Sequence, residues 1–202
     1  MTVQLYAGAK DKIVRSAREI FVAHGYEHVT MAQLAQACGI TRRGLYYHFR
    51  HKEELYRATL RLGNVEAFEW GDQAASQALA RGASALDVLS EWLDARFGET
   101  RRRVNDSPHG RELNEVAFRV GADIMIEVSY GSNRKLAELI EELCRRGLLK
   151  LRSGVTAEKL GRLIGDGARG VNQARPPIPN SLIAQHYRDV TEAILYGCAE
   201  SP

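Results

Sequence analysis

The spacing of hydrophobic positions along the chain is helical almost from end to end. Apolar side chains recur every three or four residues, and we find no convincing strand pattern. Glycine, proline and small polar residues separate the helical segments. The pattern predicts helices over residues 10–24, 30–38, 41–49, 52–79, 85–103, 110–129, 133–147, 156–173 and 180–197. We therefore expect an all-α protein with eight to ten helices.

Two short helices near the N-terminus have clear start signals. Thr30 opens the sequence Thr-Met-Ala-Gln, a capping box that Gln33 completes. Gly39 and Ile40 form a tight turn, and Thr41 can cap the helix that follows. A short helix, a tight turn and a second short helix over about residues 31–50 are typical of a helix-turn-helix motif.

The second helix of this motif has an unusual outer face. At about 100° per residue, Leu45 and Phe49 point toward the core of a three-helix head. The remaining faces carry no acid and consist of Arg42, Arg43, Gly44, Tyr46, Tyr47 and His48. Glycine costs about 1 kcal/mol relative to alanine inside a helix. Gly44 makes sense if a DNA backbone or base edge comes close to this face, and arginines at a recognition-helix N-terminus can read bases.

The charge of the chain is distributed unevenly. The 202 residues carry a net charge of +3, with nine Lys and Arg against five Asp and Glu in residues 1–57 and nineteen against twenty in residues 58–202. Between Glu27 and Glu53 there is no acid at all. Such a stretch suits a polyanion, because a carboxylate would repel phosphates. On charge alone, a solvated surface face is an equal alternative.

Composition excludes several classes of protein. No run of 18 apolar residues occurs, and five Lys, Arg and Asp side chains fall within the first twenty residues, so we expect neither a membrane span nor a secretory signal. The three cysteines, Cys38, Cys144 and Cys198, are widely spaced. This argues against a disulfide framework or a zinc ribbon and favours the cytoplasm.

The residues of the head resemble the DNA-binding domain of the TetR family of bacterial transcriptional regulators. The resemblance covers residues 10–60 and is most specific in the run Leu-Tyr-Tyr-His-Phe followed by Lys-Glu-Glu-Leu. It implies contacts to DNA phosphates from Thr30, Thr41, Tyr46 or Tyr47, His48 and Lys52, and base reading by Arg42, Arg43 and Gly44, with Tyr46 near a thymine methyl group. His51, where the family often has Ser or Asn, and Cys38, where Ala is commoner, lie off the reading face.

The remaining residues are expected to form a helical body. We divide the chain into a helix-turn-helix DNA-binding domain, residues 10–57, and an effector-binding and dimerisation domain, residues 58–202. The resemblance implies a pocket for a small, apolar ligand among the middle helices. From residue type alone, we expect this pocket to be lined by Phe68, Trp92, Phe97, Phe118, Met125 and Tyr130. The alternative is that most of these side chains are simply core.

The last two predicted helices suggest a dimer interface. They form a hairpin with more apolar surface than one chain need cover, and two hairpins related by a twofold axis make a four-helix bundle. Gly161, Gly165 and Ala168 leave a groove that another helix can enter. The expected interface is Leu160, Gly161, Ile164, Gly165, Ala168, Ile183, Tyr187, Val190 and Ile194. The alternative is that the hairpin packs only on its own body.

Two other features of the sequence, a glycine-rich motif and a pair of histidines, do not indicate a binding site. Residues 165–170 spell G-x-G-x-x-G, but the residues before them have a helical period, whereas a dinucleotide site needs a strand. Gly25 separates His24 from His28, which argues against a metal pair. We expect no metal and no cofactor.

The hypothesis is a homodimeric repressor that releases a palindromic double-stranded DNA operator on binding a small effector. The alternatives are an activator, a regulator gated by a protein partner, and an enzyme with a vestigial DNA-binding head.

Overall fold

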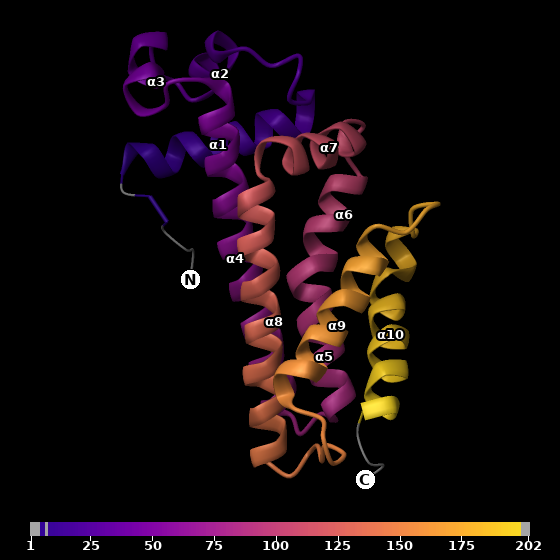
Figure 1. The fold of residues 1–202 in the computed structure, drawn as a ribbon. Coiled ribbons are helices and arrows are strands. Elements are labelled where there is room, and N and C mark those ends of the chain that lie inside the picture. Colours follow the sequence, from indigo (N-terminus) through magenta and orange to yellow (C-terminus); the bar gives the residue numbers. More distant parts are fainter. Residues whose placement is uncertain (1–4, 7, 199–202) are drawn as a thin grey trace. The chain divides into compact units, whose positions relative to one another are not determined.

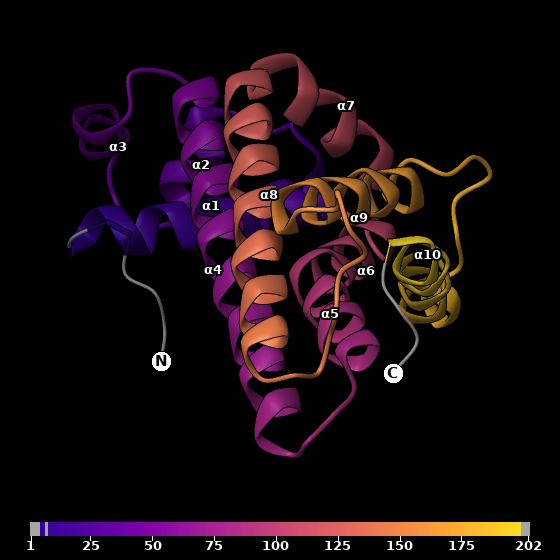
Figure 2. The ribbon, with the colours of Figure 1, turned by 60° about the horizontal axis from the view of Figure 1, so that its bottom comes forward.

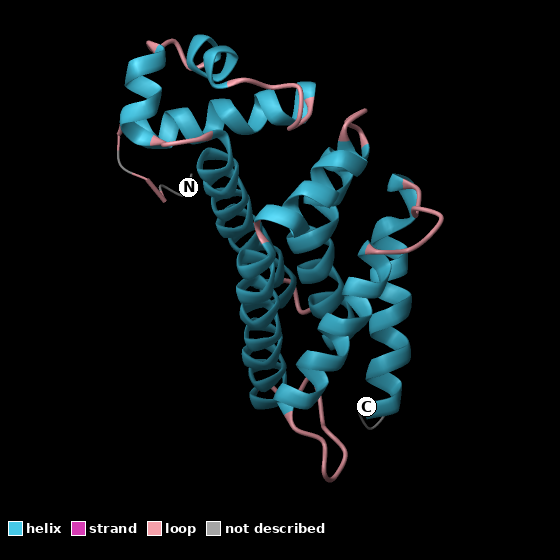
Figure 3. Cartoon of the chain, turned by 45° about the horizontal axis from the view of Figure 1, so that its top comes forward, coloured by secondary structure: helices cyan, strands magenta, loops and turns pink. Residues whose placement is uncertain are grey.

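The computed structural model describes residues 5–6 and 8–198, and this part of the chain forms helices and no β-strand (Figures 1 and 3). The helices are α1 (Ala9–His24), α2 (Met31–Ala37), α3 (Arg42–His48), α4 (Lys52–Ala80), α5 (Ala85–Leu93), a π-helix (Asp94–Gly98), α6 (Glu99–Asn105), α7 (Gly110–Val120), α8 (Ala122–Arg145), α9 (Ala157–Asn172), a 3-10 turn (Asn180–Leu182) and α10 (Ile183–Cys198). The all-α prediction is confirmed. No helix in the described part has the length and hydropathy of a membrane span.

One predicted helix boundary is wrong. The sequence pattern predicted a break at residues 131–133, but α8 continues through Gly131 and the chain breaks instead at Gly121. The Gly121 N–H donates to the Ala117 carbonyl and closes α7. A Cβ on Gly121 would lie 2.7 Å from Leu60 Cδ1, so only glycine fits this corner. At Gly131 the ring of Phe68 packs close to the helix, and its Cζ atom lies 3.3 Å from the position that a Cβ on Gly131 would take.

The expected single helix over residues 85–103 contains a wider turn. A π-helix at Asp94–Gly98 separates α5 from α6. Such a turn inserts one extra residue into the helix and shifts the face that follows. A hydrophobic period of three or four residues cannot show this insertion. Its consequence is that Arg96 is buried, with 2% of its surface exposed.

The described chain divides into two compact units, and the first contains the predicted head. It comprises residues up to Glu66 together with Arg102–Ile126. Its core joins α1, α2, α3, the start of α4 and α7, and an aromatic trio of Phe21, Tyr26 and Tyr56 lies within it. The buried Tyr56 hydroxyl donates to the Leu113 carbonyl at 2.9 Å, and burial raises the pKa of this phenol. Residues 102–126 therefore pack with the head, although the sequence analysis assigned them to the body.

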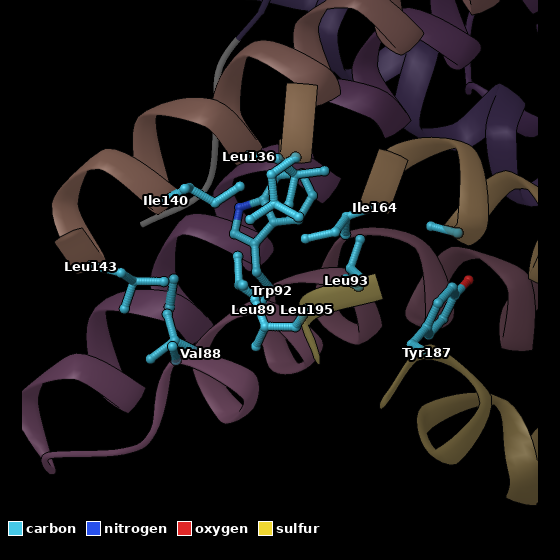
Figure 4. Close-up of a cluster of buried hydrophobic side chains, with 14 of the residues drawn as sticks. Val88, Leu89, Trp92, Leu93, Leu136, Ile140, Leu143, Ile164, Tyr187 and Leu195 are labelled. Atoms are coloured by element: carbon cyan, nitrogen blue, oxygen red, sulfur yellow. The ribbon is translucent and has the colours of Figure 1, made fainter. Parts of the chain in front are cut away.

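The second unit, Ala67–Arg101 with residues from Glu127 onward, has its own hydrophobic core. Helices α5, α8, α9 and α10 all contribute side chains to it, with Trp92 near the middle of the cluster in Figure 4. The side chains labelled there are Val88, Leu89, Trp92, Leu93, Leu136, Ile140, Leu143, Ile164, Tyr187 and Leu195. Figures 1 and 2 show α10 beside α9, in agreement with the contacts between these helices.

The groove predicted to receive a second copy of the chain is filled within the same chain. A Cβ on Gly161 would lie 2.9 Å from the Ala137 nitrogen, and one on Gly165 would collide with the Asn133 side chain, so α8 occupies the groove of α9. Its flanking residues Leu160, Ile164 and Ala168 have no exposed surface.

The α10 stripe assigned to the interface also faces its own body. Ile183 and Tyr187 are fully buried. Val190 and Ile194 are half-buried and lie against Gly167 of α9. The assignments of Ile183 and Tyr187 are corrected: an apolar stripe at helical spacing does not reveal whether its partner is the same chain or another, and here the same chain covers these two side chains.

The turn after α1 supplies a stability prediction. Gly25 has φ +77° and ψ 168°, a region that is essentially restricted to glycine. A Cβ there would also collide with the Glu112 carboxylate. Gly82 has a similar φ of +74° with nothing within 4 Å of its Cβ position, and it is the matched control.

We expect Gly25→Ala to lower the free energy of unfolding by roughly 2–4 kcal/mol and Gly82→Ala by about 1–2 kcal/mol, since only the first adds a collision to the backbone strain. Urea denaturation followed by circular dichroism measures both. Equal losses would contradict this account of the turn.

Candidate nucleic-acid interface

Helix α3 is fixed by its cap and by two buried side chains. The Thr41 hydroxyl accepts the Gly44 N–H at 3.0 Å, which satisfies one of the free amides at the helix start. Leu45 is fully buried and Phe49 is 2% exposed, so they anchor the inner face in the head core. The opposite face is thereby directed to solvent, as the sequence pattern predicted.

That outer face presents cations and aromatic rings. Arg42, Arg43, Tyr46 and Tyr47 are all exposed, and Tyr47 reaches 85% exposure. The Arg42 guanidinium lies 5.6 Å from the centroid of the Tyr46 ring, a cation–π contact that restrains both side chains. The Tyr47 and His48 rings meet edge to face at 5.1 Å. An exposed, acid-free face of this kind can approach a phosphate backbone and reach base edges.

The two threonines expected to contact phosphates differ in what their hydroxyl groups can still do. The Thr30 hydroxyl accepts the Gln33 N–H at 3.3 Å and donates to Gln33 Oε1 at 2.8 Å, so the capping box uses both functions. The Thr41 hydroxyl only accepts, from Gly44, and its own hydrogen can serve a phosphate. Thr30 would instead act through the N-terminus of α2, where amides favour anions.

Lys52 lies in a different environment from the one the resemblance implied. It is half-buried, and its ammonium donates to the Tyr26 carbonyl at 2.7 Å and to the Glu27 carbonyl at 3.2 Å. The same ammonium lies 4.3 Å from the Tyr26 ring centroid. Two of its three N–H groups are therefore used to hold the turn after α1, and one remains for DNA.

The same turn is held from α7. Glu112 accepts the Glu27 N–H at 2.7 Å, and the Glu27 carboxylate pairs with Arg119, which lowers the pKa of Glu27. Sequence reasoning missed Glu112 and Arg119. Their partners lie 85 and 92 residues away along the chain, and no local pattern encodes contacts at that separation.

The residues proposed to line an effector pocket are only partly brought together. The rings of Phe68 and Phe97 lie 6.4 Å and 6.1 Å from Trp92. Phe118 and Tyr130, in contrast, are 54% and 69% exposed, and each points to solvent within its own unit instead of lining an enclosed site. Met125 is half-buried.

Arg96 is a member of this cluster that the sequence analysis missed. Its guanidinium lies 4.1 Å from the Phe68 ring centroid and 4.6 Å from that of Phe97. Burial lowers the pKa of Arg96 to about 10, so the group stays charged at neutral pH. No local signal marked it, because the π-turn that contains Arg96 leaves no trace in the hydrophobic period.

The sequence is similar to those of known bacterial regulatory proteins. Residues 13–59 match the family model for bacterial regulatory proteins of the tetR family. The repressor AcnR of Corynebacterium jeikeium is 26% identical over 87% of this chain and 93% of its own length. TcmR of Streptomyces glaucescens is 33% identical, but the match spans 46% of this chain and 38% of that regulator. The regulator QacR of Staphylococcus aureus is 36% identical over 32% of each chain.

Solved structures match nearly the whole chain. A transcriptional regulator from Cytophaga hutchinsonii superposes with a TM-score of 0.75 over 96% of this chain and 100% of its own, at 18% identity. Thermus thermophilus FadR, a repressor solved with lauroyl-CoA, gives a TM-score of 0.63 over 96% and 97%, at 21% identity. At these identities the likeness establishes a shared fold.

Proposed function

Since this chain belongs to the TetR family of bacterial regulatory proteins, which are helix-turn-helix transcriptional regulators and not enzymes, we propose that it is a repressor of a specific operator. TetR-family regulators bind operator DNA, form dimers and bind small-molecule effectors. The proposal specifies which residues of this chain carry each of these activities.

The exposed face of α3 is the observation that carries the proposal. Arg42 and Arg43 stand in its first turn, where recognition helices reach base edges. Both can donate two parallel hydrogen bonds to guanine, and Arg42 is restrained by the Tyr46 ring. Tyr47 and the Thr41 hydroxyl are accessible to phosphates and would fix the register of the helix. A dimer would present two such helices to the two halves of a palindrome.

Arg43 gives the direct test of this assignment. Arg43→Ala should weaken operator binding by about 1–3 kcal/mol and relax the base preference at one position of each half-site, because it removes a base contact. Binding of the full chain to a library of operator variants at fixed salt measures both effects. Arg111→Ala is the matched control, since Arg111 is an exposed arginine of α7, where no DNA contact is proposed. Unchanged base preference in Arg43→Ala would refute the assignment.

The dimer interface is proposed on the surface that α10 leaves uncovered. Exposed positions on and just before this helix recur at steps of three and four, and they are Leu182, Gln185, Asp189, Ala193 and Tyr196. Tyr196 is 58% exposed and Leu182 is 47% exposed, both large for solvent-facing apolar side chains. A twofold partner packing on this stripe would cover them.

We expect Tyr196→Glu to raise the dimer dissociation constant at least about tenfold, because a charge replaces a buried aromatic contact in both copies. Leu148→Glu is the control, an equally drastic change at a side chain that is 40% exposed in the loop after α8. Sedimentation equilibrium measures the constant. A wild-type monomer that binds a full palindrome would overturn the interface and the dimer together.

The effector is proposed to bind beside Phe68, Trp92 and Phe97. Aromatic side chains with one buried polar group are usual in small-molecule sites, and Arg96 provides that group. A ligand that binds better to a state with low DNA affinity shifts the population toward that state. The FadR structure with lauroyl-CoA shows that a neighbour of this fold holds a long acyl chain.

Tryptophan fluorescence tests this site, because the chain has only Trp70 and Trp92. Dodecanoate should quench the emission of the wild type and of Trp70→Phe saturably, and the quenching should disappear in Trp92→Phe. The same titration should release labelled operator. Quenching that persists in Trp92→Phe but not in Trp70→Phe would place the ligand elsewhere.

A further inference from the structure

The head contains a cavity that neither DNA reading nor the proposed effector site uses. It is a hollow largely open to solvent, with a volume of about 610 Å³. It is bounded by the C-terminal half of α1, the turn that follows, one face of α2 and the residue before α7. The lining residues are Ile20, His24, His28, Val29, Gln33, Gln36, Ala37 and His109. All of them belong to the first compact unit.

The polar groups of the lining are mainly hydrogen-bond donors. The capping box engages Gln33 Oε1, which accepts the Thr30 N–H at 2.9 Å, so the Gln33 amide has its NH₂ group left to offer. Gln36, His24 and His28 are exposed, and their side chains can turn an N–H toward a ligand. No Asp or Glu is among the lining residues, so no carboxylate on the cavity wall would repel an anion.

His109 is oriented by an acid outside the lining. Its Nδ1 lies 3.4 Å from Glu112 Oε2, which leaves Nε2 as the ring nitrogen that can serve a ligand. Among the described residues, no group of three or more His, Cys, Asp and Glu side chains is arranged to hold a metal ion.

We infer that this cavity binds a small organic carboxylate whose apolar part packs on Ile20, Val29 and Ala37. The carboxylate would accept hydrogen bonds from the Gln33 and Gln36 amides and the imidazoles of the lining. Its lining includes none of the residues proposed to contact DNA and none of the aromatic cluster around Trp92. It gives the head a ligand site of its own.

Occupancy of the cavity lowers DNA affinity by electrostatics. Gln33 is one helical turn from Thr30, roughly 5 Å along the axis of α2. A carboxylate held there adds a negative charge within one Debye length, about 10 Å at 0.1 M salt, of a helix start that faces phosphates. This consequence rests on the proposed DNA binding, whereas ligand binding itself does not.

The binding test uses benzoate, with benzamide as its neutral isostere, on the full-length protein. Side-chain histidine resonances are followed by NMR at constant pH and ionic strength. Benzoate should shift the signals of His24, His28 and His109 saturably, with a dissociation constant at or below about 1 mM. The signals of His51 and His186, outside the cavity, should stay in place. Benzamide should bind at least about tenfold more weakly, because it lacks the charge.

The variant Gln36→Glu places a carboxylate on the cavity wall at an exposed helical position and should abolish benzoate binding. Gln73→Glu makes the same change on the exposed surface of α4 and should leave binding intact. Equal affinity for benzoate and benzamide, unsaturable shifts, or full binding by Gln36→Glu would each overturn the inference.

A second measurement separates this site from the proposed function. Saturating benzoate should raise the operator dissociation constant about two- to fivefold relative to benzamide at equal ionic strength, a coupling at or below the low end of the usual range. Specific histidine shifts without any operator binding would refute the repressor proposal and leave the cavity assignment standing. Operator binding without histidine shifts would refute the cavity assignment and leave the repressor proposal standing.

Discussion

The turn from Gly25 to Val29 is the point on which the DNA-binding head depends. It connects α1 to α2 through a backbone conformation that requires glycine, and charged side chains hold it from two sides. Lys52, at the start of α4, donates to two of its carbonyls, and Glu112 of α7 accepts one of its amides. Hydrogen bonds to charged groups contribute about 1.5–3 kcal/mol each, more than neutral ones, so these few contacts hold the turn that leads into α2.

The position of α2 in turn sets that of α3. The two short helices pack on each other, and neither is long enough to be stable in isolation. Their caps define where each helix starts, while Leu34, Leu45 and Phe49 fix the buried sides. What remains outside is the face of arginines and tyrosines. Because this face is held in place before binding, it would lose less side-chain freedom on contact with DNA.

The sequence was most informative where contacts are local. The capping box at Thr30, the cap at Thr41 and the buried side of α3 follow from spacing within one or two turns, and all were predictable. The hydrogen bonds of Lys52 to the turn were not predicted, because family resemblance identifies a position and not its neighbours in space. The groove of Gly161 and Gly165 was recognised as a packing surface, but only the fold shows that α8 fills it. Glu112 was not predictable, because its partner Glu27 is distant along the chain. Arg96 was not predictable, because it lies in a π-turn that leaves no periodic signal.

We expect Lys52 to support DNA binding by holding the turn, through its hydrogen bonds to the Tyr26 and Glu27 carbonyls, more than by neutralising a phosphate. The most direct test is the salt dependence of operator binding by Lys52→Met, which keeps an apolar stem but removes the ammonium. We expect about tenfold weaker binding with an unchanged slope of log K against log salt concentration, since each lost phosphate contact would reduce the slope by about 0.9. A slope reduced by that amount, with the head still fully folded by circular dichroism, would contradict it.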